Sequence, residues 1–102
     1  MGLTIILEDE RGAVVDSIPD PTNILHRLLP PPDSNNFRCL NRVDWYGDTV
    51  FNRAQMADVV EELDRITKLA SDSEERALLN RIAGLATRGQ EVPHLYLKFY
   101  GD

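Results

Sequence analysis

Hydrophobic residues recur at helical spacing in the second half of the chain. At 100° per residue, six apolar side chains fall on one stripe, namely Met56, Val59, Val60, Leu63, Ile66 and Ala70. The opposite face carries charged side chains, namely Asp58, Glu61, Glu62 and Arg65. Asn52 precedes Gln55 by three residues, which resembles a capping box. The pattern therefore predicts an amphipathic helix that begins at Asn52 and buries its apolar stripe.

A second apolar stripe follows at once. The segment Ser71-Asp72-Ser73-Glu74 repeats the cap pattern, and the stripe consists of Leu78, Ile82, Leu85 and Ala86. Arg88-Gly89 supplies a basic last turn and a C-terminal glycine, so we expect this helix to end there. Two consecutive helices joined by a tight turn should form an antiparallel pair.

Segments near the two ends of the chain have the residue pattern of β-strands. Leu3 to Leu7 and Ala13 to Val15 flank a turn at Asp9–Gly12, which predicts an N-terminal hairpin. His94 to Tyr100 alternates strictly, and its apolar residues Leu95, Leu97 and Phe99 face one way. We therefore expect the last strand to bury one face and expose the other.

The middle of the chain is less regular. Asp20 and Pro21 should begin a short helix that reaches about Leu29. The prolines and turn residues at 30–36 predict a loop, residues 37–43 predict a third strand, and residues 49–51 a brief further strand. Strands at both ends with helices between them predict an α+β two-layer sandwich, in which an antiparallel helix pair covers one face of a small, mostly antiparallel sheet.

The length and charge of the chain narrow the classes of function. Its 102 residues fit a single globular domain spanning 1–102. A net charge of -6 disfavours nucleic-acid binding and favours a basic protein partner. The one cysteine, Cys39, excludes an internal disulfide. It indicates a core thiol in a reducing compartment, with a disulfide between two chains as the alternative.

The N-terminus lacks the basic region of a signal peptide. The chain also has no apolar run approaching about 20 residues, so we expect no membrane span. The sequence therefore predicts a cytoplasmic protein.

The segment from Val43 to Asn52 gathers the one tryptophan, a tyrosine, a phenylalanine and two aspartates around Gly47. Asp44, Trp45, Tyr46 and Asp48 are compatible with an acidic, aromatic recognition loop, since aromatic residues dominate binding hot spots. Alternatively, Trp45 fills the core and the aspartates shape a turn.

Acidic residues are also concentrated between Asp58 and Arg76, where seven acids stand against three bases. Most such faces are only solvated, and the pairs Glu61–Arg65 and Asp64–Lys68 would contribute about 0.2–0.5 kcal/mol each. If the partner is basic, Asp58, Glu61 and Glu62 would instead steer its approach.

Four residues form the enzymatic alternative. A small enzyme or ligand-binding domain would need one pocket built from Asp44, Asp48, Glu91 and His94. The sequence contains no zinc-ligand spacing, nucleophilic serine elbow or phosphate-binding glycine loop. We therefore expect no cofactor, no metal and no enzymatic activity.

The outer face of the last strand should carry His94, Tyr96, Lys98 and Tyr100. Because the helices are expected on the opposite face, this one needs a loop, a second subunit or a partner as cover. A homodimer through this face is the simplest of these arrangements.

The segments Tyr46–Gln55 and His94–Asp102 together resemble small uncharacterised bacterial proteins, some of which are similar to immunity proteins of polymorphic toxin systems. The resemblance covers roughly a third of the chain and includes no motif specific to a known activity. It implies a cytoplasmic, acidic binder that occludes the active surface of a toxin. It assigns no functional residue.

Overall fold

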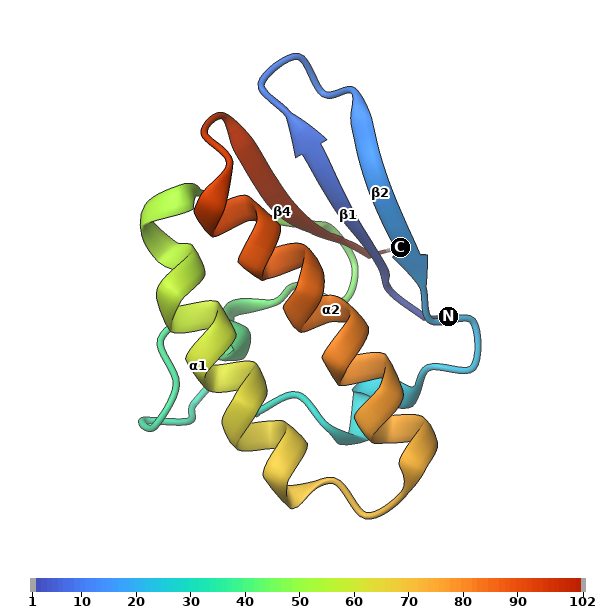
Figure 1. Cartoon of the computed structure of the whole chain (residues 1–102). Helices are drawn as coiled ribbons and strands as arrows, with labels where there is room; N and C mark the ends of the chain where they lie inside the picture. The colour runs from blue at the N-terminus through green and yellow to red at the C-terminus, as the bar shows by residue number, and fades with distance from the viewer. Residues whose placement is uncertain (1, 102) are drawn as a thin grey trace.

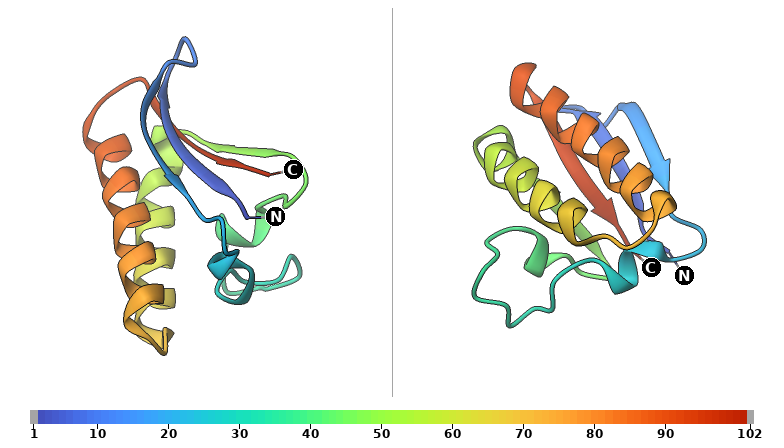
Figure 2. Two further views of the ribbon diagram at one scale, coloured as in Figure 1. Left: turned by 90° about the vertical axis from the view of Figure 1, so that its right-hand side faces the viewer. Right: turned by 60° about the horizontal axis from the view of Figure 1, so that its bottom comes forward.

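The computed structural model describes residues 2–101 and has the predicted α+β architecture, a four-stranded antiparallel sheet packed against two antiparallel helices (Figure 1). The strands are β1 (Thr4–Asp9), β2 (Val14–Pro19), β3 (Asp48–Phe51) and β4 (Leu95–Tyr100). The helices are α1 (Arg53–Leu69) and α2 (Ser73–Glu91), and two short 3-10 helices are η1 (Ile24–Arg27) and η2 (Leu40–Arg42). Figure 2 shows α1 and α2 on one side of the molecule and the sheet on the other.

The strand order is β2-β1-β4-β3, so the last strand of the chain lies inside the sheet. Ile5 stands opposite Phe99 on one side and Ile18 on the other, and all three are buried. Phe51 meets Phe99 edge to face, with ring centroids 5.8 Å apart. One face of the sheet therefore forms the core with the helices, as the alternation in β4 predicted.

The start of α1 is confirmed. Asn52 Oδ1 accepts a hydrogen bond from the Gln55 N–H at 3.2 Å, and the Asn52 N–H donates to Gln55 Oε1 at 2.9 Å. Four residues of the predicted stripe are buried, namely Met56, Val59, Leu63 and Ile66. The capping box thus begins the helix whose apolar stripe supplies much of the core.

The start of α2 lies within the predicted cap segment, but its end is displaced. The N-cap is Asp72, whose carboxylate accepts from the Glu75 N–H at 2.8 Å. Gly89 does not end the helix, which continues to Glu91. Instead, a Cβ at Gly89 would lie 3.0 Å from the Met56 side chain, so this glycine permits close packing of α2 on α1.

The predicted third strand over residues 37–43 is wrong. This segment contains η2 and lies beside α1, where the Glu62 carboxylate accepts hydrogen bonds from three consecutive N–H groups of Arg38, Cys39 and Leu40 at 2.9–3.2 Å. These backbone donors are satisfied by a carboxylate, so they need no strand partner.

The predicted exposure of Glu62 is wrong for the same reason. Its side chain is 2% exposed because the segment that it binds covers it. A buried carboxylate normally requires partners of this kind, since transfer from water without them is strongly unfavourable. Glu62 is therefore a structural residue of the α1 layer and is not available at the surface.

Asp20 has the predicted capping role but in a different element. Its carboxylate accepts from the N–H groups of Ile24 at 2.9 Å and Leu25 at 2.8 Å, and it is buried. The helix expected up to Leu29 is replaced by the four-residue η1, whose N-cap Asn23 has a left-handed backbone with φ of 57°.

Candidate functional site

The loop between η2 and β3 is held against the end of β4 by backbone contacts. The Asp44 N–H donates to Thr49 Oγ1 and the Tyr46 N–H donates to Asp44 Oδ1, both at 2.9 Å. The Gly101 N–H donates to the Gly47 carbonyl at 2.8 Å. A Cβ at Gly101 would lie 2.5 Å from the Trp45 carbonyl oxygen, so only glycine permits this approach.

The two aromatic residues of this loop have different environments. Trp45 is partly buried, packs against the core and meets His26 edge to face, with ring centroids 5.6 Å apart. Tyr46 is 85% exposed. Of the two sequence-based interpretations, the core role fits Trp45, whereas Tyr46 is the aromatic side chain that the loop presents to solvent.

The sheet face opposite the helices carries further exposed aromatic and aliphatic side chains. Tyr100 and Val50 are 47% and 50% exposed, and Lys98 lies between them in the ladder, opposite Val50. Lys98 Nζ lies 3.4 Å from Asp48 Oδ2 and 5.7 Å from the centre of the Tyr100 ring. We call this surface the tyrosine face; it comprises Ile6, Asp48, Val50, Tyr96, Lys98 and Tyr100.

The loop adjoins one end of the tyrosine face. Tyr46 and Tyr100 each adjoin the backbone hydrogen bond that joins Gly47 to Gly101. Within residues 2–101, both helices lie on the other side of the sheet (Figure 2). The structure therefore brings together Tyr46, Asp48 and the outer residues of β4, three of the features that the sequence marked separately.

The acidic positions on α1 are elsewhere. Asp58 and Glu61 are exposed, and Glu61 Oε2 accepts from Arg65 Nε at 2.6 Å. The Arg65 guanidinium in turn lies 4.4 Å from the centre of the Phe37 ring. Glu61 is thus largely neutralised by its own helix, and Asp58 remains as an exposed carboxylate on this flank.

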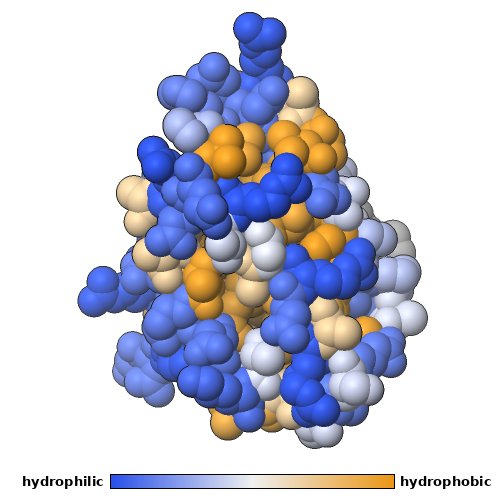
Figure 3. Space-filling model, viewed as in Figure 1, coloured by the Kyte–Doolittle hydropathy of each residue, from blue (hydrophilic) through white to orange (hydrophobic). Residues whose placement is uncertain are grey.

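The helix side of the molecule is predominantly hydrophilic. Figure 3 shows polar side chains over most of this side, with hydrophobic patches towards the end where α2 meets the strands. Apart from Tyr46 and the tyrosine face, the large hydrophobic residues exposed at the surface are Val14, Val15, Leu69 and Val92.

The four residues of the enzymatic alternative do not converge. Asp48 stands opposite Tyr100 at one end of β4, whereas His94 precedes the other end. The six residues of this strand separate the two positions by about 20 Å. Asp44 contacts Thr49 near Asp48, and Glu91 ends α2 near His94. The expected pocket is therefore divided between opposite ends of the strand.

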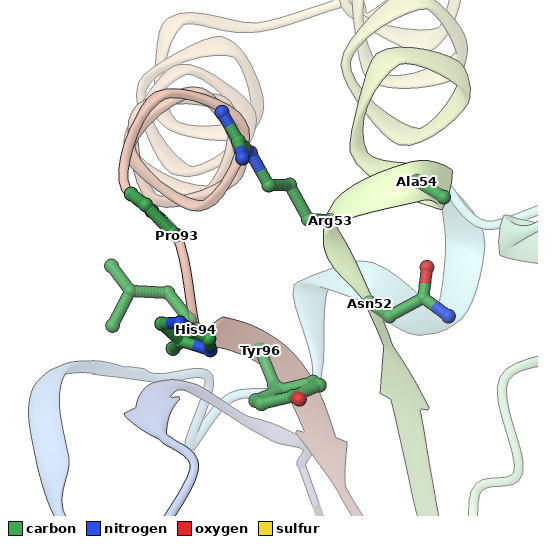
Figure 4. A pocket seen from close by; sticks show the side chains of 7 residues that line it. Asn52, Arg53, Ala54, Pro93, His94 and Tyr96 are labelled. Carbon is green, nitrogen blue, oxygen red and sulfur yellow. The ribbon is translucent and has the colours of Figure 1, made fainter.

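A groove of about 290 Å³ lies beside His94 (Figure 4). Figure 4 shows His94 and Tyr96 from the start of β4 on one side, with Asn52 and Arg53 from the start of α1 on the other. His94 Nδ1 lies 3.4 Å from Glu10 Oε2, and Arg53 Nε donates to the Gln90 carbonyl at 2.9 Å. Each of these side chains thus already has one nitrogen in contact with another group of the protein.

An apolar pocket of about 340 Å³ lies between the proline loop and the end of α1. Its walls are mainly aliphatic and aromatic, namely Leu28, Leu29, Pro30, Pro31, Phe37, Ile66 and Leu69. Arg27 at its rim is bound to Glu75, with Nε 2.6 Å from Oε2. The pocket therefore offers mainly apolar surface, with an ion-paired arginine at its rim.

Cys39 is a buried free thiol, as expected from the sequence. Burial raises its pKa to about 11, and the nearby carboxylates of Glu62 and Asp58 act in the same direction. Since the thiolate is the reactive form, the folded protein suppresses the chemistry of this residue.

Metal-binding and membrane-spanning features are both missing from residues 2–101. No group of three or more His, Cys, Asp and Glu side chains in this part of the chain is arranged to hold a metal ion. Among the same residues, no helix has the length and apolar character needed to cross a membrane.

Comparison with models of known protein families, with curated proteins and with solved structures gives no match for this chain. The resemblance to immunity proteins therefore stays a prediction.

Sequence reasoning missed Val50 and Ile6 as parts of the candidate surface. Their positions depend on how β1 and β3 pair with β4, because both stand opposite Lys98. The alternation within β4 identified the tyrosines, but the neighbours of those tyrosines require the strand order.

Proposed function

We propose that this chain is a small protein-binding module and that its contact surface is the tyrosine face together with Tyr46. The observation that supports the proposal is the exposure of Tyr46, Val50 and Tyr100 on the side of the sheet away from α1 and α2 (Figure 2). Tyrosine combines a large rigid apolar surface with a hydroxyl group, so it is enriched at the centres of protein interfaces. In its most concrete form, the proposal is that this chain is an immunity or inhibitor protein that occludes the surface of a toxin or enzyme.

The charge of the chain favours a basic partner. The net charge is -6, and Asp44 and Asp48 lie at the end of the tyrosine face. Asp48 Oδ2 lies 3.4 Å from Lys98 Nζ, and both side chains are partly exposed to solvent. A lysine or arginine of the partner would compete with Lys98 for this carboxylate, while the overall charge would accelerate association.

The exposed carboxylate of Asp58 on α1 lies outside the proposed contact surface. It lies on the flank of α1 beside the segment that Glu62 binds, away from the outer face of the sheet. We assign it a long-range steering role, in which Glu61 contributes less because it is paired with Arg65. Glu62 has no such role, because it is buried.

The enzymatic alternative has less support. It requires Asp44, Asp48, Glu91 and His94 to act on one substrate, yet about 20 Å of strand separates the two ends of the set. The groove at His94 contains only that histidine from the set among its lining residues. We therefore favour a binding protein, and we place its action in the cytoplasm because Cys39 is kept as a buried free thiol.

The test is capture of a partner from a lysate of the source organism by the full chain. The tyrosine variant is Tyr46→Ser combined with Tyr100→Ser, and the matched control is Leu69→Ser, which alters an exposed apolar residue on α1. We expect the unmodified chain and the control to retain the same basic protein in stoichiometric amount, and the tyrosine variant to lose it. Melting curves of both variants establish that they are folded.

Two results would contradict the proposal. One is recovery of the chain alone at low salt, where electrostatic attraction is strongest. The other is equal capture by a folded tyrosine variant, which would move the interface to another surface.

A further inference from the structure

The two edges of the sheet differ in what their backbones offer to another strand. The edges are β2 and β3, and in an antiparallel ladder alternate residues direct their N–H and C=O groups to the neighbouring strand or away from it. The outward groups of an edge strand can pair with a strand of another chain. The hydrogen bonds at the ends of the sheet establish which residues point outward.

The edge at β2 is blocked at Ser17 and Pro19. The Asp20 N–H donates to the Leu3 carbonyl at 2.9 Å, so the register directs Ser17 and Pro19 away from β1. The Ser17 N–H is taken by Asp16 Oδ1 at 2.8 Å, and Pro19 has no N–H. Neither position therefore has a donor available to a further strand.

The edge at β3 is open. The Gly101 N–H donates to the Gly47 carbonyl, so Thr49 and Phe51 point towards β4 while Asp48 and Val50 point outward. Within residues 2–101, the outward N–H groups of Asp48 and Val50 donate to no acceptor. Val50 is also half exposed, so the edge is accessible.

The open stretch is limited to these two residues. On one side the Tyr46 N–H is taken by the Asp44 carboxylate, and on the other the Asn52 N–H is taken by Gln55. A longer strand from another chain would thus reach N–H groups that already donate within this chain. The occupant must be short and must match two residues that each offer one N–H and one C=O.

We propose that β3 pairs with β3 of a second copy of this chain. A two-fold axis at Thr49 places Asp48 opposite Val50 of the second copy, and Val50 opposite Asp48 of the second copy. All four outward groups of each strand then find partners, and the two sheets join into one. A two-residue open edge is self-complementary under such an axis, as an isologous interface requires.

The side chains on the tyrosine face permit this pairing. The carboxylate on each β3 faces a valine, so no like charges stand opposite each other across the junction. Lys98 follows Val50 in the same row and adds an opposite charge near the approaching Asp48. The dimer places two tyrosine faces side by side and leaves both exposed, which distinguishes it from a dimer formed face to face.

The net charge of -6 on each copy opposes association. Repulsion between like-charged proteins is screened by salt, whereas the backbone hydrogen bonds of the junction are affected much less. We therefore expect the dimer to strengthen as the salt concentration rises. A dimer held by ion pairs would respond in the opposite direction.

Sedimentation equilibrium of the full chain over a range of protein concentrations tests the proposal. We expect the apparent mass to rise from the 11.6 kDa of one chain towards twice that value. Val50→Asp, which sets a second carboxylate against Asp48 across the junction, should keep the chain monomeric. Ser17→Asp is the matched control, because it adds the same charge at a blocked position of β2 and should leave the dimer intact.

Two further variants separate the edge from the tyrosine face. Val50→Pro removes an outward donor while leaving the ladder to β4 intact, so it should also give a monomer. Tyr100→Ser changes the tyrosine face without changing the edge and should leave the dimer intact. If Val50→Pro fails to fold, Val50→Asp and Tyr100→Ser decide between the two surfaces.

Three results would overturn the proposal. They are a wild-type chain that stays monomeric at every concentration, a Val50→Asp chain that dimerises like the wild type, and a Tyr100→Ser chain that becomes monomeric. The measurement uses the purified chain alone, so its outcome is independent of whether the chain captures a protein partner.

Discussion

Both carboxylate oxygens of Glu62 lie 3.2 Å from the backbone nitrogen of Cys39. The flanking N–H groups of Arg38 and Leu40 also donate to this carboxylate, so one side chain of α1 organises three residues that form no sheet. Cys39, in the middle of this segment, is 3% exposed. Glu62 therefore holds the irregular segment, with its buried thiol, over the helix.

Replacement of Glu62 by glutamine should loosen this segment. The amide group of glutamine would direct N–H donors towards backbone donors, and loss of hydrogen bonds to a charged group costs about 1.5–3 kcal/mol. We expect a lower free energy of unfolding and faster alkylation of Cys39 under native conditions. The alkylation rate, followed by mass spectrometry, measures how often the segment opens.

Glu61→Gln is the control for that experiment. Glu61 lies one residue earlier on α1 and contacts Arg65 in solvent. Its replacement should leave the alkylation rate of Cys39 close to that of the wild type. Equal acceleration by both substitutions would contradict the role assigned to Glu62.

The stability of the protein should depend on pH through Glu75. The hydrogen bond from Arg27, followed by that from the Ser71 N–H, lowers the pKa of this carboxyl below its usual value. A lowered folded-state pKa stabilises the protein above the ordinary glutamate pKa of about 4.3, and this contribution is lost as the pH falls through the folded-state value. Denaturant melts of the wild type and Glu75→Gln should therefore differ most near neutral pH and converge in acid.

Glu74→Gln is the control, since it removes an exposed carboxylate that makes no contact with Ser71 and should keep the shape of the wild-type pH profile. A difference between wild type and Glu75→Gln that stays constant into strong acid would show that the charge of Glu75 is not the source of the effect.

Two glycines of α2 should respond in opposite ways to alanine. Gly84 is exposed in the interior of the helix, and a Cβ there would meet no atom within 4 Å. Because alanine reduces the freedom of the unfolded chain and favours the helix, Gly84→Ala should stabilise by about 0.5–1 kcal/mol. Gly89→Ala should stabilise the protein less than Gly84→Ala does, or should destabilise it, since its Cβ would lie 3.0 Å from the Met56 side chain. Chemical denaturation of both variants gives the comparison.

The cap and the core of α1 should differ in how much each stabilises the protein. Asn52→Ala removes the acceptor for the Gln55 N–H and should cost about 1 kcal/mol. Leu63→Ala creates a cavity at a fully buried position and should cost about 2–5 kcal/mol. A reversed ranking in denaturant melts would contradict the packing of α1 described above.

The sequence predicted the elements whose burial repeats regularly. The stripe of α1, the alternation of β4 and the hairpin of β1 and β2 depend on local periodicity, and the structure confirms them. Residues 37–43 were predicted wrongly because their backbone donors are satisfied by Glu62, which lies more than twenty residues later. Local alternation contains no information about such a distant partner.

The candidate site could be predicted only in part. Tyr46, Tyr96 and Tyr100 were identifiable from the loop composition and from the alternation in β4. That these tyrosines lie on the same sheet face as Val50 depends on the pairing of β3 with β4. The open edge of β3 depends on the register of that pair. Both are tertiary facts that the sequence of each strand does not contain.

The tyrosine face should be covered by a protein partner in its natural setting. Hydroxyl-radical footprinting measures this directly, because the reagent labels tyrosine and leucine side chains according to their exposure. The purified chain is compared with the same chain in a lysate of its source organism, and Leu69 on α1 provides an internal control since it is 84% exposed. We predict that Tyr46 and Tyr100 become protected in the lysate while Leu69 is labelled equally in both samples. Unchanged labelling of both tyrosines, or equal protection of Leu69, would contradict the account.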